Sequence, residues 1–318
     1  MREWRRHAAL FFITLLTTTF AGIIYATNDA DVAEPQMRAF SGSWLDYVTY
    51  IPEYYLKLIG VFLAQALAST NLIGQGAMFA CALLFVLAAH EAGHYIACRL
   101  YGVDATLPFF IPAPPLFLAG TFGAFIKIKS QIPSKRALFD IGVAGPIAGF
   151  MALLPVALIG LWTAHTAPPL AGDQIVFNDP LLFKLIARLF NIQDLAHIAP
   201  NPFYFAAWIG LLVTSLNLLP VGQLDGGHAV YAVFGRRVHK WLGLLAFLFV
   251  AVLAILGWRW HNSPSGFLYA VLLAVMLRVR HPQAGDETEQ LGRARKWLAA
   301  LTLLIFLLSF MPFPLTII

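Results

Sequence analysis

The chain has 318 residues, of which 59% are hydrophobic and only 12% are charged, and its mean hydropathy is +0.74. A soluble domain normally carries about a quarter of charged residues, so this composition excludes an ordinary soluble enzyme and indicates a polytopic membrane protein. The net charge of +5 reflects a shortage of acidic residues, and Lys and Arg lie in short scattered clusters, so we expect no nucleic-acid partner.

Apolar windows predict the helices of a membrane bundle. A spanning helix needs about 20 apolar residues, or fewer where neighbouring helices shield its ends. We therefore expect an all-α polytopic membrane protein, a bundle of about six to eight transmembrane helices. The windows in chain order are 8–26, 54–70, 76–98, 137–163, 203–221, 240–257, 264–279 and 297–314.

The first two windows differ from the others. The window 8–26 follows a basic head and lacks a good small-x-small cleavage site, so we expect an uncleaved membrane anchor. The window 54–70 is short and carries Lys57. A spanning 54–70 segment would also invert the orientation that the later loops favour, so we expect this segment to be interfacial or re-entrant.

The segment 104–132 is not expected to form one helix. It contains four prolines, and GTFGAFIKIKS ends in an alternating pattern from Phe125 to Lys129 that suits a strand or hairpin. Non-helical backbone at membrane depth survives only when it is buried in protein or lines a watery cavity. We therefore expect a small membrane-embedded β-strand or re-entrant region that lines such a cavity.

Loop charges predict the orientation of the bundle, because cytoplasmic loops carry an excess of Lys and Arg. The loops 27–50 and 164–202 should lie outside, and the second contains PLLFKLIARLF, an expected surface helix. The stretch 280–296 is expected to be a solvated linker. Four basic clusters should share the cytoplasmic side, namely Arg99, residues 127–136, residues 236–240 and residues 278–296.

The sequence HEAGH places three ionisable groups inside the apolar window 76–98. Charged groups inside a membrane span are costly, so they persist when they pair, bind a metal or face water. His90 and His94 are four residues apart, so they lie on one face of a helix where both can reach one zinc ion. Glu91 can act as general base, which is the arrangement used for metal-assisted peptide hydrolysis.

The alternative for HEAGH is a chance match, with histidines satisfied by neighbouring helices. We favour the metal site because the pattern lies in an apolar run, where unpaired polar groups are costly. Cys98 continues the four-residue spacing, but it lies about 12 Å along the helix axis from His90. Zinc bonds are only about 2.0–2.3 Å long, so we expect Cys98, like Cys81, to be a packing residue.

A second polar island, SLNLLPVGQLDGGH, follows later in the chain. A catalytic zinc takes three protein ligands and one open position, so a third ligand is required. Asn217 lies in an apolar helix that Pro220 and Gly222 break, and a helix broken inside a membrane needs protein or water partners. Asp225 is a suitable oxygen ligand and His228 is its competitor. The structural alternative is a turn in which Asp225 caps the next helix.

Together these residues resemble the site-2 protease family of intramembrane zinc metalloproteases. HEAGH matches the HExxH motif of that family, and the second island matches its Asn/Asp-x-x-Pro and LDG motif. FDIGVAGPIAGF is similar to the Gly-Pro segment of the family. GTFGAFIKI is similar to the strand region of the branch found in plastids and photosynthetic bacteria. The resemblance covers residues 76–240.

The resemblance implies roles for the candidate residues. His90, His94 and Asp225 are the implied zinc ligands, and Glu91 is the implied general base. Asn217 is implied to contact the substrate backbone or to stabilise the oxyanion, which suits a neutral amide donor near the metal. The alternative for Asn217 is a helix–helix hydrogen bond.

We expect three units along the chain: an N-terminal anchor with a peripheral or re-entrant segment (1–75), a catalytic intramembrane protease core (76–240) and C-terminal transmembrane helices (241–318). The expected function is that of an intramembrane zinc metalloprotease, which hydrolyses peptide bonds within or next to transmembrane helices in regulated intramembrane proteolysis. The expected cofactor is Zn²⁺, and the expected partners are transmembrane protein substrates and the lipid bilayer. We expect a multi-pass protein of the bacterial inner membrane, with the active site near the cytoplasmic side.

Two other functions are compatible with these residues. One is a membrane metal-binding protein or zinc transporter that uses His90, His94 and Asp225 as a transit site. A transporter usually spaces acidic or His residues along several helices, whereas here the polar residues concentrate in two islands, which favours one fixed site. The other is a catalytically inactive scaffold, against which the intact Glu91 argues.

Overall fold

A computed structural model of the protein describes residues 2–27, 35, 42, 44–166, 175–192, 195, 198–279, 281, 285–286, 289 and 291–317. The helices in this part of the chain are α1 (Arg2–Ala26), α2 (Trp44–Ala68), α3 (Thr70–Leu100), α4 (Lys135–Trp162), α5 (Leu181–Leu189), α6 (Pro202–Asn217), α7 (Asp225–His261), α8 (Ser265–Arg278) and α9 (Arg293–Ser309). The strands are β1 (Phe109–Pro112), β2 (Thr121–Phe125), β3 (His165–Thr166), β4 (Ile175–Phe177), β5 (Ile198–Ala199) and β6 (Leu315–Ile317).

Four of the described helices are long and apolar enough to cross a membrane, namely Trp4–Ala26 within α1, and α3, α4 and α7. Helices α6 and α8 are apolar but shorter, at 16 and 14 residues. The prediction of a mostly helical membrane protein with a small strand region is therefore confirmed. The count of about six to eight spans stays a prediction. Helix α5 also confirms the helix expected within residues 164–202, and the outer placement of this loop stays a prediction.

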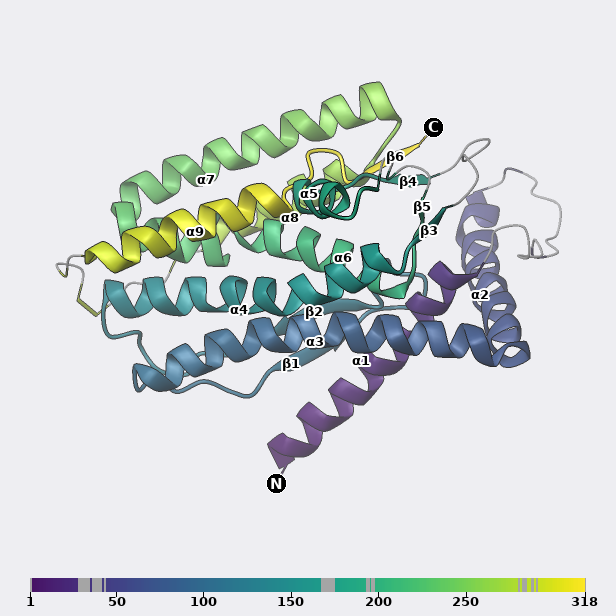
Figure 1. Cartoon of the computed structure of the whole chain (residues 1–318), viewed down its shortest axis with the longest axis horizontal. Helices are drawn as coiled ribbons and strands as arrows, with labels where there is room; N and C mark the ends of the chain where they lie inside the picture. The colour runs from purple at the N-terminus through teal and green to yellow at the C-terminus, as the bar shows by residue number, and fades with distance from the viewer. Residues whose placement is uncertain are drawn as a thin grey trace.

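Most of the long helices lie side by side and form a bundle. Figure 1 shows α3, α4, α6, α7 and α9 running along the long dimension of the molecule, with α1 crossing them obliquely. Helix α2 stands crosswise at one end of the bundle and packs against α3 and α1. It is not among the described helices that are long and apolar enough to cross a membrane. The sequence predicts an interfacial or re-entrant placement for it. That placement stays a prediction.

The predicted strand region is a hairpin. Strand β1 pairs antiparallel with β2, so that Phe109 faces Phe125 and Ile111 faces Gly123. Helix α1 packs on this hairpin, mainly on β1. Two hydrogen bonds join the two ends of α1 to the hairpin. His7 Nδ1 donates to the carbonyl of Pro108 at 3.0 Å, and the hydroxyl of Tyr25 donates to the carbonyl of Leu118 in the hairpin loop at 2.6 Å. The hairpin is thus held against the bundle by a helix from the start of the chain.

Three of the four basic clusters lie at one end of the bundle. Figure 1 shows that α3 ends and α4 begins at the end opposite α2, where α8 also ends and α9 begins. The end of α3 and the starts of α4 and α9, which adjoin three of the four basic clusters, therefore share one end of the bundle. The side of the membrane on which this end lies stays a prediction.

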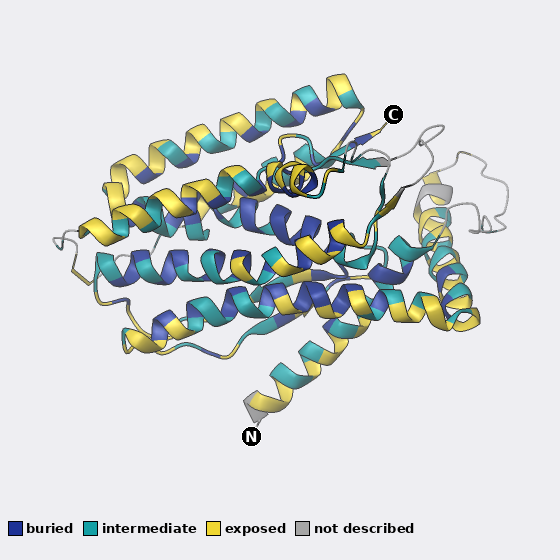
Figure 2. Ribbon diagram, viewed as in Figure 1, coloured by how far each residue is buried: buried dark blue, intermediate teal, exposed yellow. Residues whose placement is uncertain are grey.

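The core lies between α3, α4 and α6, and the outside of the bundle is apolar. Phe79, Leu83 and Trp208 are fully buried, and the indole N–H of Trp208 donates to the carbonyl of Asn178 at 2.8 Å. Figure 2 shows that exposed residues dominate the outer helices α7 and α9. Many of them are large and apolar, such as Leu245 at 57% exposed. An apolar exterior of this kind matches a bilayer as solvent.

The connection between α8 and α9 contacts the bundle at the residues that the structure describes. The backbone N–H groups of Gly285 and Asp286 donate to the carbonyls of Ile132 and Pro133, both at 2.9 Å. Arg136 and Glu289 form an ion pair at 2.7 Å. Gly285 and Asp286 are also exposed, so the expectation of a solvated linker stays a prediction, whereas the contacts with the bundle were not expected.

Candidate metal centre

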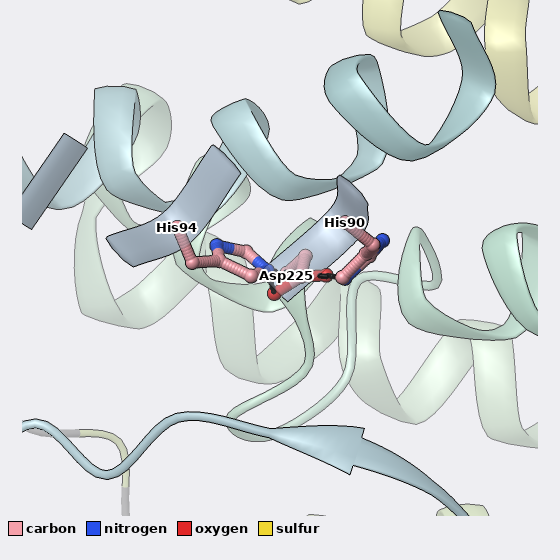
Figure 3. Close-up of side chains that lie close together, drawn as sticks. All are labelled: His90, His94 and Asp225. Atoms are coloured by element: carbon pink, nitrogen blue, oxygen red, sulfur yellow. Dashed lines mark hydrogen bonds and ion pairs between the residues drawn. The ribbon is translucent and has the colours of Figure 1, made fainter. Parts of the chain in front are cut away.

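Helix α3 brings the HEAGH residues to one buried place. His90, Glu91 and His94 are only 6%, 6% and 8% exposed, although all three are ionisable. The two histidines lie one turn apart on the same face, and their Nε2 atoms are 3.1 Å apart. Figure 3 shows their rings directed toward Asp225. The spacing predicted from the sequence is thus realised in the interior of a 31-residue helix.

Asp225 meets both histidines from the first residue of α7. Its Oδ2 lies 3.2 Å from His90 Nε2, and its Oδ1 lies 3.3 Å from His94 Nε2. Figure 3 shows the carboxylate between the two rings. Residues far apart in the sequence therefore converge on one point, as expected of a metal site.

The glycines around Asp225 explain how its carboxylate reaches the histidines. Helix α6 ends at Asn217, and Gly222 adopts a φ of +54° in the short connection to α7. A Cβ added to Gly226 would lie 2.0 Å from the carbonyl oxygen of Leu218. Only a residue without a side chain therefore lets the first turn of α7 pack on the end of α6.

The three residues fit a zinc ion. One nitrogen of each histidine and one oxygen of Asp225 lie within 4.8 Å of one another. Such donors bind Zn²⁺ at about 2.0–2.2 Å, and three protein ligands leave a fourth position open. His94 Nδ1 donates to the carbonyl of Ile141 at 2.7 Å, which leaves the lone pair of Nε2 for a metal.

Helix α4 forms one wall of the site because two of its glycines make room for imidazole rings. A Cβ at Gly145 would lie 2.1 Å from His94 Nε2, and a Cβ at Gly149 would lie 3.0 Å from His90 Cβ. Both glycines belong to FDIGVAGPIAGF. This gives a physical reason for the Gly-Pro segment: the α4 backbone lies directly against the histidine rings.

A cavity of about 640 Å³ opens beside these residues. Its lining includes Glu91, Asn217 and His228, together with the end of β2 and the residues after it, Ala124 to Ile128. Glu91 lies near the backbone amide of Ile126. A carboxylate, a possible metal site and a strand therefore share one cavity.

The remaining sequence candidates occupy different places. Asn217 lines the cavity from the last residue of α6. His228 does not belong to the three-residue group. Its Nδ1 lies 2.8 Å from Nε2 of His281. Cys98 is fully buried in a cluster with Val103 and Leu138, which agrees with a packing role. The assignment of catalytic Glu91, of the three ligands and of Asn217 stays a prediction.

Sequence reasoning missed a polar network that joins the end of α3 to α4 and α9. The guanidinium of Arg295 donates from Nε and Nη2 to the two carboxylate oxygens of Asp140, at 2.9 and 2.6 Å. The hydroxyl of Tyr101 also donates to Asp140. Partial burial and the nearby carboxylate raise the pKa of Tyr101, so the hydroxyl remains a donor. An Asp inside an apolar window was the available signal, since such a group needs a partner.

The fold and the site together define a class of membrane metallopeptidases, in which an HExxH helix and a distant Asp meet beside a strand. Residues 78–256 match Peptidase family M50, so the chain belongs to this family. The predicted resemblance, the metalloprotease class and zinc as the metal of the family are thereby confirmed. No solved structure matches the chain.

Curated relatives carry names of the same class. The Arabidopsis thaliana protein named probable zinc metalloprotease EGY1, chloroplastic, is 31% identical over 238 residues, which is 72% of this chain and 42% of the relative. The Arabidopsis thaliana protein named EGY2 is 30% identical over 260 residues, 79% of this chain and 44% of the relative. The Oryza sativa subsp. japonica protein named EGY1 is 32% identical over 234 residues, 71% and 38% respectively. The chain thus spans less than half of the length of these relatives. Because they are chloroplastic, the predicted bacterial inner membrane is not supported.

Proposed function

We propose that this protein is an intramembrane zinc metalloprotease, which hydrolyses peptide bonds within or next to the transmembrane helices of its substrates in regulated intramembrane proteolysis. The observation that carries the proposal is one cavity that holds Glu91 together with His90, His94 and Asp225. Helices α3 and α7, which supply these residues, are apolar enough to cross a membrane. Hydrolysis at this cavity would therefore act on substrates held in the lipid bilayer.

His90, His94 and Asp225 are the proposed zinc ligands. A zinc ion held there supplies Lewis-acid activation of water and of the scissile carbonyl. Glu91 accepts the proton of the attacking water and later delivers it to the leaving amine. The burial of Glu91 keeps its carboxylate beside the metal ligands and limits access of bulk water.

Asn217 is the proposed partner of the substrate backbone or of the oxyanion. Its position supports this role, because it lines the same cavity as Glu91 from the end of a different helix. A neutral amide N–H can stabilise charge that develops on the carbonyl oxygen. Replacement of Asn217 by Ala is expected to lower kcat with the zinc content unchanged.

The substrate segment is proposed to bind as an added strand. A helical peptide bond is shielded by its own hydrogen bonds, so the substrate helix must unwind before cleavage. Strand β2 pairs with β1 on one side, and its end lines the cavity, which supports addition of an extended substrate segment there. Prolines introduced within residues 122–126 should abolish cleavage at normal zinc content; unchanged cleavage would contradict strand addition.

The proposed orientation and organisation follow the charge pattern and the chain order. The metal centre is proposed to lie near the side that carries the basic clusters, which is the cytoplasmic side by the positive-inside rule. The proposed units remain an anchor with a peripheral segment (1–75), a catalytic core (76–240) and C-terminal helices (241–318). The family match to residues 78–256 overlaps the whole core except its first two residues, which supports the first boundary.

The decisive test is Glu91→Gln in the purified, zinc-loaded protein with a single-span test substrate. Loss of a general base lowers the rate by about 10²–10⁴-fold, and the zinc content should stay normal because Glu91 is not a ligand. Glu53→Gln, in α2, is the matched control and should cleave normally. Retained cleavage by Glu91→Gln would refute the protease mechanism. Zinc flux across vesicles would support the transporter instead.

A further inference from the structure

Two histidines outside the metal centre hold the turn that carries Asp225. His239 Nε2 donates to the carbonyl of Gly222, three residues before Asp225, at 3.2 Å. His281 Nε2 lies 2.8 Å from Nδ1 of His228, three residues after Asp225. The turn is thus contacted on both sides, by the later part of α7 and by the segment that follows α8.

This turn needs such support because α7 is not one continuous helix. The helix is interrupted at Gly235, where φ is 78° and ψ is 177°, so residues 225–234 form a short segment of their own. Its N-cap, Leu224, offers no side-chain hydrogen bond. A short uncapped helix is marginal without tertiary contacts. The position of Asp225 therefore depends on what packs against this segment.

His281 packs closely against the short segment 225–234. Its ring stacks on Tyr231, with ring centroids 4.2 Å apart and an interplanar angle of 8°. Tyr231 is only 2% exposed. A Cβ added to Gly142 of α4 would lie 2.8 Å from His228 Cβ. His228 therefore lies against both the α4 backbone and the His281 ring.

These imidazoles do not form a second metal site. Among the described residues, the group of side chains whose donor atoms converge is His90, His94 and Asp225, and it includes none of the imidazoles of this support. The ring of His239 contacts the ring of His281 at a centroid distance of 5.0 Å, and its Nε2 is directed to a carbonyl. The three histidines therefore pack against the turn that carries Asp225 and form hydrogen bonds with it.

We propose that His281 is a positioning residue for the metal centre: by holding His228 and Tyr231, it fixes the first turns of α7 and hence the Asp225 carboxylate between His90 and His94. The proposal rests on the proposed role of Asp225 as a zinc ligand. It assigns a function to a segment outside the region that matches Peptidase family M50.

The test measures the zinc Kd of the full chain by competition with a chelator, so that it does not depend on proteolysis. His281→Phe keeps a ring against Tyr231 and removes the hydrogen bond to His228. Changes in groups that orient metal ligands typically weaken metal binding by about 10–100-fold, and we expect a loss in this range. His281→Gln retains a hydrogen-bonding side chain and should recover most of the affinity. His261→Phe, at the far end of α7, is the matched control and should leave the zinc Kd unchanged.

A double mutant tests whether His281 affects zinc binding through its contact with His228 or through the general stability of the protein. If His281 acts through His228, then His228→Phe with His281→Phe should bind zinc no more weakly than His228→Phe alone. Fully additive losses would overturn the proposal, as would a normal zinc Kd in folded His281→Phe. If His281→Phe does not fold in detergent, His281→Ala serves with the same expectations. Absence of proteolysis with a zinc Kd that still depends on His281 would refute the proposed function and leave this inference standing.

Discussion

The two halves of the candidate metal centre, His90 with His94 and Asp225, are built in different ways. The histidine half lies inside one long regular helix, α3, so local spacing alone brings His90 and His94 to one face. The aspartate half begins a short helical segment that follows an irregular connection and is separated from the rest of α7 at Gly235. The first half is therefore preset by one element, whereas the second depends on contacts from segments distant in sequence.

The difference predicts where the site is sensitive to substitution. The histidine half should fail only when a neighbouring backbone is forced into the rings, as α4 would be by an added side chain. The aspartate half should respond to changes in several places that never touch the metal. The following substitutions and measurements compare the two halves directly.

The largest effect is expected from Gly145→Ala. A Cβ at this position would lie 2.1 Å from His94 Nε2, and it belongs to a helix backbone that cannot move away easily. His94 must leave its position, so zinc affinity should fall by more than the about 100-fold typical of supporting residues. The zinc Kd is measured by chelator competition.

The matched control for Gly145→Ala is Gly74→Ala. Gly74 lies in α3 itself, and a Cβ there would meet nothing within 4 Å. It should leave zinc affinity unchanged and raise helix stability by up to about 1 kcal/mol. Normal zinc affinity in Gly145→Ala would show that the histidine half tolerates displacement, contrary to the comparison.

A smaller effect is expected from Gly226→Ala in the aspartate half. The added Cβ would lie 2.0 Å from the carbonyl oxygen of Leu218, so the short segment must shift. We expect zinc affinity to fall by about 10–100-fold, and overpacking to lower the free energy of unfolding by about 1–3 kcal/mol. Thermal unfolding in detergent and the zinc Kd test both, with Gly60→Ala in α2 as control. A loss of stability with normal zinc affinity would mean that the turn is not coupled to the metal.

Removal of zinc should affect the local stability of the two halves differently, without any mutation. Without the metal, the backbone of α3 around His90 keeps its helical hydrogen bonds, and the first turn of α7 loses one of its supports. Amide hydrogen exchange should therefore rise by about tenfold or more in residues 218–230 and change little in residues 86–96, which reflects local opening of the less stable unit. Equal increases in both segments would contradict the view that only the aspartate half depends on distant contacts.

The same difference explains how much of the site could be predicted from the sequence. The histidine half was predicted because the four-residue spacing within an apolar helix is a local pattern. Asp225 was predicted through the LDG motif and the family resemblance, and the sequence alone left His228 as a competitor. The structure brings Asp225 to the histidines and pairs His228 with His281. Such pairings join residues far apart in the chain, and no local pattern encodes them.

The fold was predictable to a similar degree. The apolar windows located helices, and the prolines and glycines of residues 104–132 indicated a non-helical region that proved to be a hairpin. The alternating residues 125–129 lie mostly outside it, because β2 ends at Phe125. The docking of the connection between α8 and α9 was not predicted, because its polar composition is shared by solvated and docked loops. The glycines of α4 were predicted as part of a motif, but their contact with the imidazole rings appears only in three dimensions.

The smallest effect on the metal site is expected from Arg295→Gln. This change breaks the paired hydrogen bonds to Asp140, both groups being 23% exposed, and loosens α9 from α4. We expect a loss of about 1–2 kcal/mol in the free energy of unfolding. Zinc affinity should change by less than about threefold, because the histidine half that α4 contacts is preset by α3 and distant effects are nearly independent.

The control for Arg295→Gln is Arg293→Gln, an exposed residue at the start of the same helix, which should alter neither stability nor zinc affinity. The comparison with His281→Phe is the informative one. Both changes affect contacts made from outside the matched family region, but only His281 acts on the turn that carries Asp225. If Arg295→Gln weakened zinc binding as much as His281→Phe, the zinc affinity would depend on how the whole C-terminal part packs on the bundle. If only His281→Phe weakens zinc binding, then the position of Asp225 depends on distant contacts and the positions of His90 and His94 do not.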